Sequence, residues 1–274
     1  IKNSNPMEVS LKKPLSNYSW LVKQYEMIKS SDSPDILEKF IPREDLSIVF
    51  HFGNPPFMLH PHYGELPPYF IAPVVSKPQH MRVSETNISF IVTCKPSVFT
   101  RIFNINLQVC KYSYVELPAI PFEALWKQLS IYSNLEEWIK CFEGFINNFQ
   151  GSEYEKDHID ILYDRIVSQD NNQAISKIEM EFPVSQRTLQ RQFIRRVGTS
   201  PKRLERISRI NRVWDLISFD KIIDYQNLVI KGCYYDQSHF IKEFKEIVGE
   251  TPDNFFKRDL ENVKIMSGKT EREN

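Results

Sequence analysis

The prolines limit the fold of this chain more than any other feature, because they are concentrated in one half of it. Fourteen of the 17 prolines lie between Pro6 and Pro121, and the other three are at positions 183, 201 and 252. Proline lacks a backbone N–H and breaks a helix when it lies inside one. The first part of the chain is therefore predicted to form strands and loops, and the last part is free to form long helices.

The residue pattern divides the chain in the same way. Residues 46–52, 69–75 and 87–94 are rich in β-branched or aromatic residues and are predicted strands. From Glu123 onward the pattern becomes helical, and residues 122–130 and 135–149 place apolar residues three and four apart. Polar residues 150–157 then indicate a linker. We expect one domain over residues 1–152, a second over residues 153–262 and a polar tail over residues 263–274.

Several classes of protein are excluded by what the sequence lacks. No two of the eight glycines lie within six positions of each other, which excludes the common glycine-rich nucleotide-binding motifs. The four cysteines form no close pair, so neither a zinc ribbon nor a disulfide framework is indicated, and a reducing cytoplasm fits best. No apolar run approaches the roughly 18 residues of a membrane span.

Charge is balanced over the whole chain but not along it. Thirty-five Lys and Arg match thirty-five Asp and Glu, giving a formal net charge of zero. Residues 185–212 nevertheless hold nine basic side chains and one acidic side chain, whereas residues 151–184 carry a net −5 and residues 213–274 a net −3. The local excess of +8 predicts one basic surface. The overall balance argues against indiscriminate nucleic-acid binding, and it does not argue against DNA.

The carboxy-terminal half contains an internal repeat. At an offset of 51, the identical pairs are Gln186 and Gln237, Phe193 and Phe244, Val197 and Val248, Gly198 and Gly249, and Pro201 and Pro252. Each copy has apolar residues along one side of a helix of about three turns, and a glycine follows where the helix should end. Ser185 and Asp236 stand where each helix needs an N-cap. We predict two copies of one supersecondary unit, with helices over residues 185–197 and 236–248.

The helix of the first copy has a basic face opposite its apolar face, when about 100° is allowed per residue. The polar side chains on or beside that face are Ser185, Gln186, Arg187, Thr188, Gln190, Arg191 and Arg195. A solvated surface would also carry charges, but no acidic residue occurs from position 185 to 204, and surface helices usually mix signs. Arg with Gln, Ser and Thr on one face can contact both phosphates and base edges in a major groove.

The segment before each repeated helix completes a helix-turn-helix. Residues 175–182 predict a short helix before the turn at Pro183 and Val184, and residues 225–231 and 232–235 predict the same arrangement in the second copy. Between the copies, apolar residues at helical spacing predict a long connecting helix, namely Leu204, Ile207, Ile210, Val213, Trp214 and Ile217. Such a helix would fix the units rigidly, as two reading helices need a separation of about 34 Å to enter successive major grooves.

Two motifs extend this pattern over residues 161–258. The first unit carries Val184-Ser185-x-x-x-Leu189-Gln190-Arg191-x-Phe193 and Gly198-x-Ser200-Pro201, followed by Arg209 in the connecting helix. The second carries Tyr234-x-Asp236-Gln237-Ser238-His239-Phe240-x-x-x-Phe244-Lys245 and Gly249-x-Thr251-Pro252. Together, at this distance, they closely resemble the DNA-binding region of the AraC/XylS family of transcription regulators.

The resemblance implies a cytoplasmic transcription regulator that binds double-stranded DNA in a sequence-specific way and has no catalytic, metal or cofactor site. The face and the resemblance together give candidate DNA contacts at Ser185, Gln186, Arg187, Thr188, Gln190, Arg191 and Arg195 in the first unit and Tyr235, Gln237, Ser238 and Lys242 in the second. Because the second helix also carries Glu243 and Glu246, we expect the first unit to supply most of the affinity.

The sequence departs from the family pattern where the helices of each unit pack closely. The small residue of the first helix is replaced by Glu179 in unit one and by Val229 in unit two, and the turn glycine by Pro183 and Cys233. We expect the fold to be kept, with a changed helix contact around these positions.

The amino-terminal half is similar to an uncharacterised domain found in a subset of these regulators, over residues 40–115. Phe40-Ile41-Pro42 and Lys95-Pro96-Ser97-Val98-Phe99 carry the similarity. It implies an α+β chain, in which a β-rich, cupin-like or barrel-like domain with helices precedes an all-α domain of two helix-turn-helix units. The first domain would sense a small-molecule effector or mediate homodimer formation. RNA polymerase is a further candidate partner, and a membrane is not.

A different function is suggested by His60-Pro61-His62 and Glu65, which resemble the metal ligands of cupins. On this alternative the chain is a cupin-type metal-binding enzyme or ligand-binding protein with a degenerate helical module. His51 and His80 could join such a site, although no spacing argues for it. The surrounding prolines favour exposed loop histidines without a metal.

The aromatic residues of this half suit either a core or the lining of an apolar pocket. Two predicted helices, over residues 122–130 and 135–149, have wide apolar faces. We expect one of them to pack on the domain and the other to form a homodimer contact.

Overall fold

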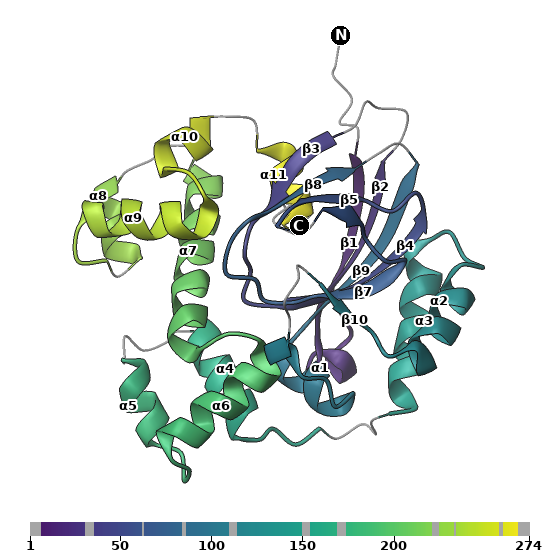
Figure 1. Cartoon of the computed structure of the whole chain (residues 1–274), viewed down its shortest axis with the longest axis horizontal. Coiled ribbons are helices and arrows are strands. Elements are labelled where there is room, and N and C mark those ends of the chain that lie inside the picture. Colours follow the sequence, from purple (N-terminus) through teal and green to yellow (C-terminus); the bar gives the residue numbers. More distant parts are fainter. Residues whose placement is uncertain are drawn as a thin grey trace.

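A computed structural model describes residues 7–30, 36–61, 63–83, 86–109, 114–149, 154–168, 174–220, 225–232, 234–257 and 260–267 of the chain. Two parts lie side by side (Figure 1). One contains two β-sheets with helices against them, and the other contains only helices. The expected α+β class, with a β-rich part followed by an all-α part, is confirmed.

The larger sheet has six antiparallel strands in the order β1-β2-β9-β4-β7-β10. Their bounds are Met7–Lys12 for β1, Val22–Ser30 for β2, Leu46–Gly53 for β4, Tyr69–Ala72 for β7, Asn87–Cys94 for β9 and Val115–Glu116 for β10. The predicted strand over residues 69–75 thus stops at Ala72, where Pro73 follows and cannot donate to the ladder. The other two predicted strands match β4 and β9.

The smaller sheet has four antiparallel strands in the order β3-β8-β5-β6. Their bounds are Ile36–Phe40 for β3, Phe57–His60 for β5, Gly64–Glu65 for β6 and Gln79–Val83 for β8. No pairing between described residues joins the two sheets into a closed barrel. The domain is therefore an open pair of sheets.

Strand β4 is buried on both sides, which explains its nearly continuous apolar sequence. Leu46, Ile48 and Phe50 face a core shared with the helices, whereas Val49 faces the space between the sheets. The aromatic residues of this half accordingly include both core residues and residues that line an apolar pocket, the two roles that the sequence allowed. Phe50, Phe90 and Phe99 are core residues, and Phe70 lines the inter-sheet space.

Three α-helices cover the outer side of the larger sheet and its ends, namely α1 (Pro96–Ile102), α2 (Ala119–Leu129) and α3 (Leu135–Asn147). Short 3-10 helices, Ser16–Tyr18 and Leu107–Val109, precede β2 and follow α1. Phe122 and Leu125 of α2 and Trp138 and Phe142 of α3 are buried in the same core. The apolar residues that suggested a homodimer contact are therefore used inside the subunit.

The helical part contains α4 (His158–Ser168), α5 (Ile175–Met180), α6 (Gln186–Val197), α7 (Pro201–Asp220), α8 (Tyr225–Lys231), α9 (Gln237–Val248), α10 (Pro252–Lys257) and α11 (Glu261–Met266). The long connecting helix is α7, and its predicted core residues from Leu204 to Trp214 are buried; the side chain of Ile217 lies outside the described residues. Among the helices in the described ranges, none has the length and apolar character that crossing a bilayer requires.

The end of the chain returns to the β-rich part. Helix α11 packs against β3 and β1, and Ile265 is buried with Met7, Ile28 and Val83. The segment assigned to a polar tail, residues 263–274, thus begins inside this helix, and residues 268–274 lie outside the described residues. The predicted linker centre, residues 150–153, also lies outside them, so the domain boundary at 152 stays a prediction.

Candidate DNA-binding surface

Unit one consists of α5 and α6, and its second helix is built as the sequence predicts. The Ser185 side chain accepts a hydrogen bond from the Thr188 backbone N–H at 3.3 Å and caps α6. Leu189, Phe193 and Val197 are completely buried. Gly198 ends the helix at φ +86°, a left-handed conformation that glycine adopts without strain.

Arg187, Arg191 and Arg195 form the exposed face of α6, and we call them the arginine stripe. All three side chains are exposed. Within the described part of the chain, none of them takes part in a hydrogen bond or an ion pair. Unpaired guanidinium groups in one row on a rigid helix can meet phosphates or guanine edges without first breaking an internal contact.

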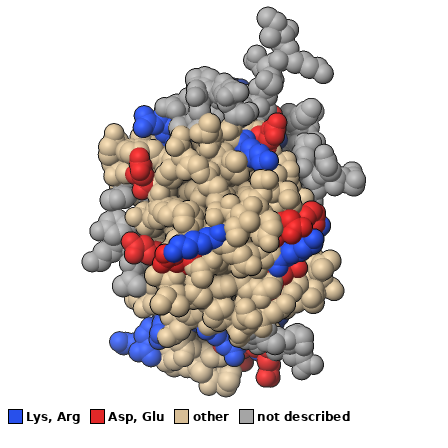
Figure 2. All heavy atoms as spheres, turned by 90° about the vertical axis from the view of Figure 1, so that its right-hand side faces the viewer, with Lys and Arg blue, Asp and Glu red and all other residues tan. Residues whose placement is uncertain are grey.

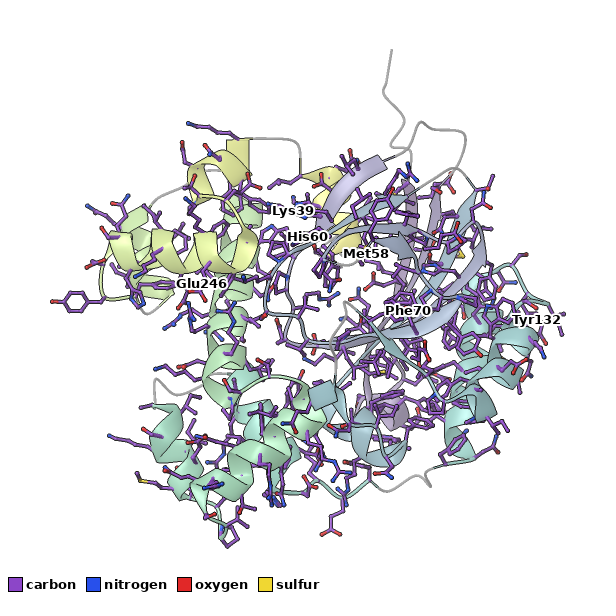
Figure 3. All side chains as sticks on the ribbon, viewed as in Figure 1. Lys39, Met58, His60, Phe70, Tyr132 and Glu246 are labelled. Carbon is purple, nitrogen blue, oxygen red and sulfur yellow. The ribbon has the colours of Figure 1, made fainter. Side chains whose placement is uncertain are left out.

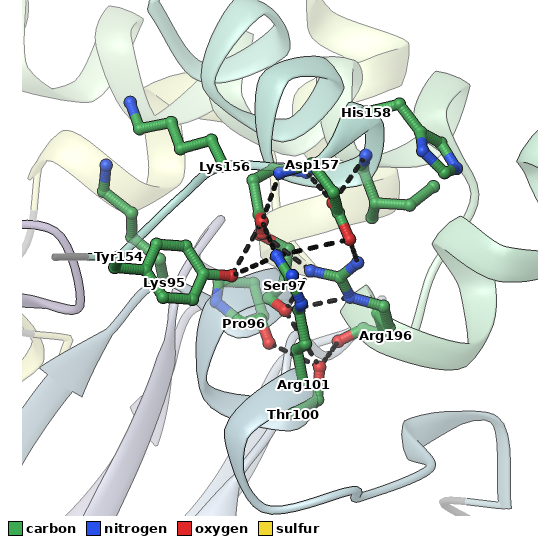
Figure 4. Close-up of polar contacts among 12 residues, drawn as sticks. Lys95, Pro96, Ser97, Thr100, Arg101, Tyr154, Lys156, Asp157, His158 and Arg196 are labelled. Carbon is green, nitrogen blue, oxygen red and sulfur yellow. Dashed lines mark hydrogen bonds and ion pairs between the residues drawn. The ribbon is translucent and has the colours of Figure 1, made fainter. Parts of the chain in front are cut away.

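The other arginines of the basic block are not part of this surface. Arg196 Nη2 donates to the Ser97 carbonyl at 2.6 Å and to Asp160 Oδ1 at 2.7 Å, and Arg196 also pairs with Asp157 (Figure 4). Arg203, Arg206 and Arg209 bond acidic side chains of α9. Of the nine basic residues that give the block its +8, four therefore neutralise internal acids.

Some predicted contacts of unit one also have internal roles. Ser185 caps the helix, and Thr188 Oγ1 accepts from the Ser185 hydroxyl at 3.0 Å. Gln190 Nε2 donates to both oxygens of Glu179, at 3.1 and 3.3 Å, although Gln190 is itself an exposed residue. Glu179 is buried in the contact between α5 and α6. Glu179 stands where the family pattern has a small residue, and the Gln190 amide of α6 bonds its carboxylate. Gln186 is exposed.

Unit two, α8 and α9, has the same caps. The Asp236 side chain accepts from the His239 backbone N–H at 2.7 Å, and Gly249 ends the helix at φ +88°. Four predicted contacts lie at the surface, namely Tyr235, Gln237, Ser238 and Lys242, and Tyr235 is 92% exposed. The turn residue Cys233 lies outside the described residues.

The acidic residues of α9 do not stand free on its surface. Glu243 is buried and accepts from Arg206, Arg209 and the Tyr234 hydroxyl. Glu246 pairs with Arg203 and Arg206, both at 2.5 Å, and the hydrogen bond from Arg206 is the main cause that lowers its pKa to about 2. The two acids thus attach α9 to α7, and their repulsion of DNA is reduced by the arginines that hold them.

Each reading helix is also attached to the β-rich domain at its carboxy-terminal end. In unit one, α1 supplies the Ser97 carbonyl to Arg196, and Thr100 Oγ1 donates to the Arg196 carbonyl at 3.0 Å. We call these contacts the unit-one clamp. In unit two, Lys39 of β3, labelled in Figure 3, lies on the side of the β-rich domain that faces the helical part. It donates to the Val248 carbonyl at 3.0 Å and pairs with Glu250. These contacts are the unit-two clamp.

Among the described residues, the histidines proposed as metal ligands do not assemble a site. His60 ends strand β5 and Glu65 belongs to β6, so these residues are on exposed strands and not in a loop as the prolines suggested. The rings of His60 and His80 are 6.2 Å apart. No group of three or more metal-binding side chains occurs among the described residues, and His62 lies outside them.

The face of the molecule turned away from the helical part looks different from α6. There, the described acidic and basic side chains lie in small, mostly mixed groups separated by uncharged surface (Figure 2). The charges of the β-rich domain are thus arranged as on an ordinary solvated surface.

Comparison with known proteins agrees with this geometry. Residues 180–258 match a family model described as a helix-turn-helix domain. No curated protein sequence matches the chain.

Solved structures with a similar arrangement include ToxT from Vibrio cholerae in its P21 form, at 12% identity over 92% of this chain and 98% of that chain, with a TM-score of 0.44. ToxT from Vibrio cholerae O395 bound to (E)-4-(8-methylnaphthalen-1-yl)but-3-enoic acid is 13% identical over 92% of this chain and 98% of that chain, with a TM-score of 0.46. The AraC-like transcriptional activator CuxR is 9% identical over 86% of this chain and 80% of that chain, with a TM-score of 0.27.

Two capped helix-turn-helix units joined by a rigid helix, with an unpaired arginine stripe on one reading helix, define a DNA-binding transcription regulator. Residues 180–258 are an AraC-type helix-turn-helix domain.

Proposed function

We propose that α6 and α9 read two successive major grooves of one DNA site, and that the first unit provides most of the affinity. The observation that carries the proposal is the arginine stripe, since Arg187, Arg191 and Arg195 are exposed and have no ionic partner among the described residues. The DNA contacts are the eleven side chains predicted from the sequence. Ser185, Thr188 and Gln190 would act mainly by holding α6 in shape, because they already make internal hydrogen bonds.

The direct test begins with selection of bound sites from random DNA by the full chain. In an anisotropy titration of the selected site at fixed salt, Arg191→Ala should weaken binding by about 1 to 3 kcal/mol. Lys127→Ala is the matched control, because Lys127 is 65% exposed on α2, far along the chain from the stripe. Equal dissociation constants for wild type and Arg191→Ala would refute the assignment of this surface.

We further propose that the β-rich domain controls DNA binding through a small-molecule effector. A largely apolar cavity lies between its sheets, and Phe40 and Arg43 line it. The two residues between them reach the helical part: Ile41 is buried in its core, and the Pro42 carbonyl accepts from Asn211 of α7 at 3.0 Å. An occupant that moves Phe40 or Arg43 would therefore also move α7.

The same wall of the cavity carries the unit-two clamp. Lys39 precedes the lining residue Phe40, and Pro78, which contacts Gly249, precedes the lining residue Gln79. The unit-one clamp rests on α1, none of whose residues line the cavity. Effector control would thus act on unit two more strongly than on unit one.

The remaining parts of the proposal are a cytoplasmic location, the absence of enzymatic activity, and contacts with a second subunit and with RNA polymerase. Sedimentation of the full chain alone and on its selected site would test the homodimer, since two copies on one site give twice the bound mass. The inner apolar faces of α2 and α3 are buried in the subunit, so a dimer through these helices would use their exposed side, where Ile120, Ile131 and Phe149 are found.

A further inference from the structure

The cavity between the sheets has a volume of about 100 Å³. Its walls come from β1, β2, β4, β7 and β9 of the larger sheet and β3, β5 and β8 of the smaller one, and twelve of its nineteen lining residues are apolar. Met58 and Phe70 belong to this lining (Figure 3). A cavity of roughly this size and character accommodates a molecule as small as benzene.

One polar atom in the wall has no partner. His51, on β4, lines the cavity and is only 5% exposed, and its Nε2 makes no hydrogen bond with any described residue. An unsatisfied nitrogen at this depth costs free energy unless something in the cavity bonds to it.

A chain of hydrogen bonds determines which proton His51 carries. Asn87 Nδ2 donates to the Asn54 carbonyl at 2.7 Å, so Asn87 Oδ1 is the acceptor for the Ser89 hydroxyl, also at 2.7 Å. The single hydroxyl proton of Ser89 is thereby used, and Ser89 Oγ must accept from His51 Nδ1 at 2.8 Å. His51 therefore holds its proton on Nδ1 and presents a bare lone pair at Nε2. Burial lowers the pKa of His51 to about 3, so the ring is neutral at pH 7.

Arg43 and Glu26 also line the cavity, and their charges are part of a balanced group. The Arg43 guanidinium lies 3.9 Å from Glu26 and 4.0 Å from Asp45, and Asp45 also pairs with Lys23. Burial raises the pKa of Glu26, an effect that Arg43 reduces. A ligand carboxylate at Arg43 would place a third acidic group around a cation that two already share.

We propose that the cavity takes a small, uncharged, mostly apolar molecule with one hydroxyl or N–H donor, and that this donor bonds to His51 Nε2. The proposal rests on the proposed effector control, because it names the class of molecule for that same cavity. The acceptor selects for a donor, the apolar walls select against strongly hydrated groups, and the balanced charges select against an anion.

Three probes of similar size separate these requirements in calorimetric titrations of the full chain. 1-Hexanol has the donor, 1-methoxyhexane keeps the chain and the oxygen but lacks the donor, and hexanoate carries a charge. We expect hexanol to bind about tenfold or more tightly than the ether, the effect of satisfying one buried acceptor, and hexanoate to bind more weakly than hexanol. The hexanol affinity should be constant from pH 6 to pH 8.

His51→Phe keeps an aromatic ring and removes the lone pair, so it should bring the ratio of alcohol to ether affinity close to one. Ser89→Ala provides a second variant that keeps the ring but no longer fixes its proton, and it should give a ratio between those of wild type and His51→Phe. Val49→Ala is the matched control, because Val49 lines the cavity with an apolar side chain. It should weaken all three probes and leave the ratio unchanged.

The proposal is overturned if hexanoate binds more tightly than hexanol, if no probe binds, or if the alcohol-to-ether ratio is equal in wild type and both His51 and Ser89 variants. Anisotropy titrations of the selected DNA, with and without each probe, distinguish a failure of the ligand class from a failure of effector control. Selective hexanol binding with unchanged DNA affinity supports the ligand class and rejects control by it. A DNA response to hexanoate alone supports control and rejects the ligand class.

Discussion

The two helix-turn-helix units have the same caps and the same helix length, yet they differ in what their reading helices are attached to. At the offset of 51, the stripe positions Arg187, Arg191 and Arg195 correspond to Ser238, Lys242 and Glu246. At these positions, unit one thus presents three cations to solvent, whereas unit two presents one and uses the third position to bind α7. The repeated residues build the units, and the residues that do not repeat decide which surface each unit offers and what holds it.

The buried acids of the units differ in the same way. Glu179 in unit one accepts from an amide of Gln190, whereas Glu243 in unit two accepts from two guanidinium groups and a phenol. A neutral partner leaves α6 attached chiefly through its apolar face and its carboxy-terminal clamp. In unit two, ion pairs from Glu243 and Glu246 also join α9 to the arginines of α7. Unit two should therefore depend more on electrostatics for its stability.

The largest expected effect tests that difference. Glu243→Ala leaves Arg209, whose side chain is only 15% exposed, without its acidic partner and should lower the free energy of unfolding by about 3 to 5 kcal/mol. Glu179→Gln, in which one amide can still bond another, should cost about 1 kcal/mol or less. Urea denaturation followed by circular dichroism measures both. Similar losses for the two variants would contradict the contrast between the units.

The next effect concerns DNA. Each phosphate contact changes the slope of log affinity against log salt by about 0.9. Replacing Arg187, Arg191 and Arg195 together by Ala should reduce the magnitude of that slope by about 3, and Lys242→Ala should reduce it by about 1 or less. Anisotropy titrations from 50 to 200 mM salt on the selected site give both slopes. A larger change for Lys242→Ala would assign the main contribution to unit two.

The two clamps provide a smaller and more local test. Lys39→Met removes the hydrogen bond to the Val248 carbonyl and keeps an aliphatic chain, whereas Thr100→Val removes the one to the Arg196 carbonyl and keeps the shape. We expect Lys39→Met to change the protection of the DNA backbone beside α9 by about three- to tenfold in hydroxyl-radical footprints. Thr100→Val should change the half-site under α6 and leave the half-site under α9 unchanged. An altered half-site under α6 in the Lys39 variant would contradict separate attachment.

The sequence is sufficient to predict the parts of this surface that depend on neighbours along the chain. The cap at Ser185, the buried series from Leu189 to Val197 and the glycine that follows all act within one or two turns, so local pattern determines them. The sequence does not indicate which arginines of the basic block are free. Arg196 bonds a carbonyl 99 positions away, and Arg206 bonds an acid 37 positions away.

The same reason explains why the cavity was not located from the sequence. Its lining comes from strands of two sheets whose pairing follows no local rule. The partner that fixes the proton of His51 is 38 residues away on β9, so the residue pattern could only group this histidine with candidate metal ligands. Local pattern therefore predicts the helices that read DNA, and tertiary packing determines what would control them.

The smallest effect is a pH dependence at the third stripe position, which is Arg195 in unit one and Glu246 in unit two, and it should occur in unit two only. The pKa of Glu246 is lowered from 4.5 to about 2, first by its hydrogen bond from Arg206. A group with a lowered pKa contributes stability above its unfolded pKa and loses it as the pH falls toward the folded one. The gap in unfolding midpoint between wild type and Glu246→Gln should thus be greatest above pH 5 and shrink between pH 4.5 and pH 2. Because the Glu246 side chain is 45% exposed, solvent screening should keep the corresponding difference in the free energy of unfolding below about 1 kcal/mol. Arg195→Gln, at the corresponding position of unit one, has no partner to lose among the described residues and should follow wild type across this range. A gap for Glu246→Gln that is constant with pH, or that widens in acid, would exclude the ion pairs with α7 as the element that distinguishes the second unit.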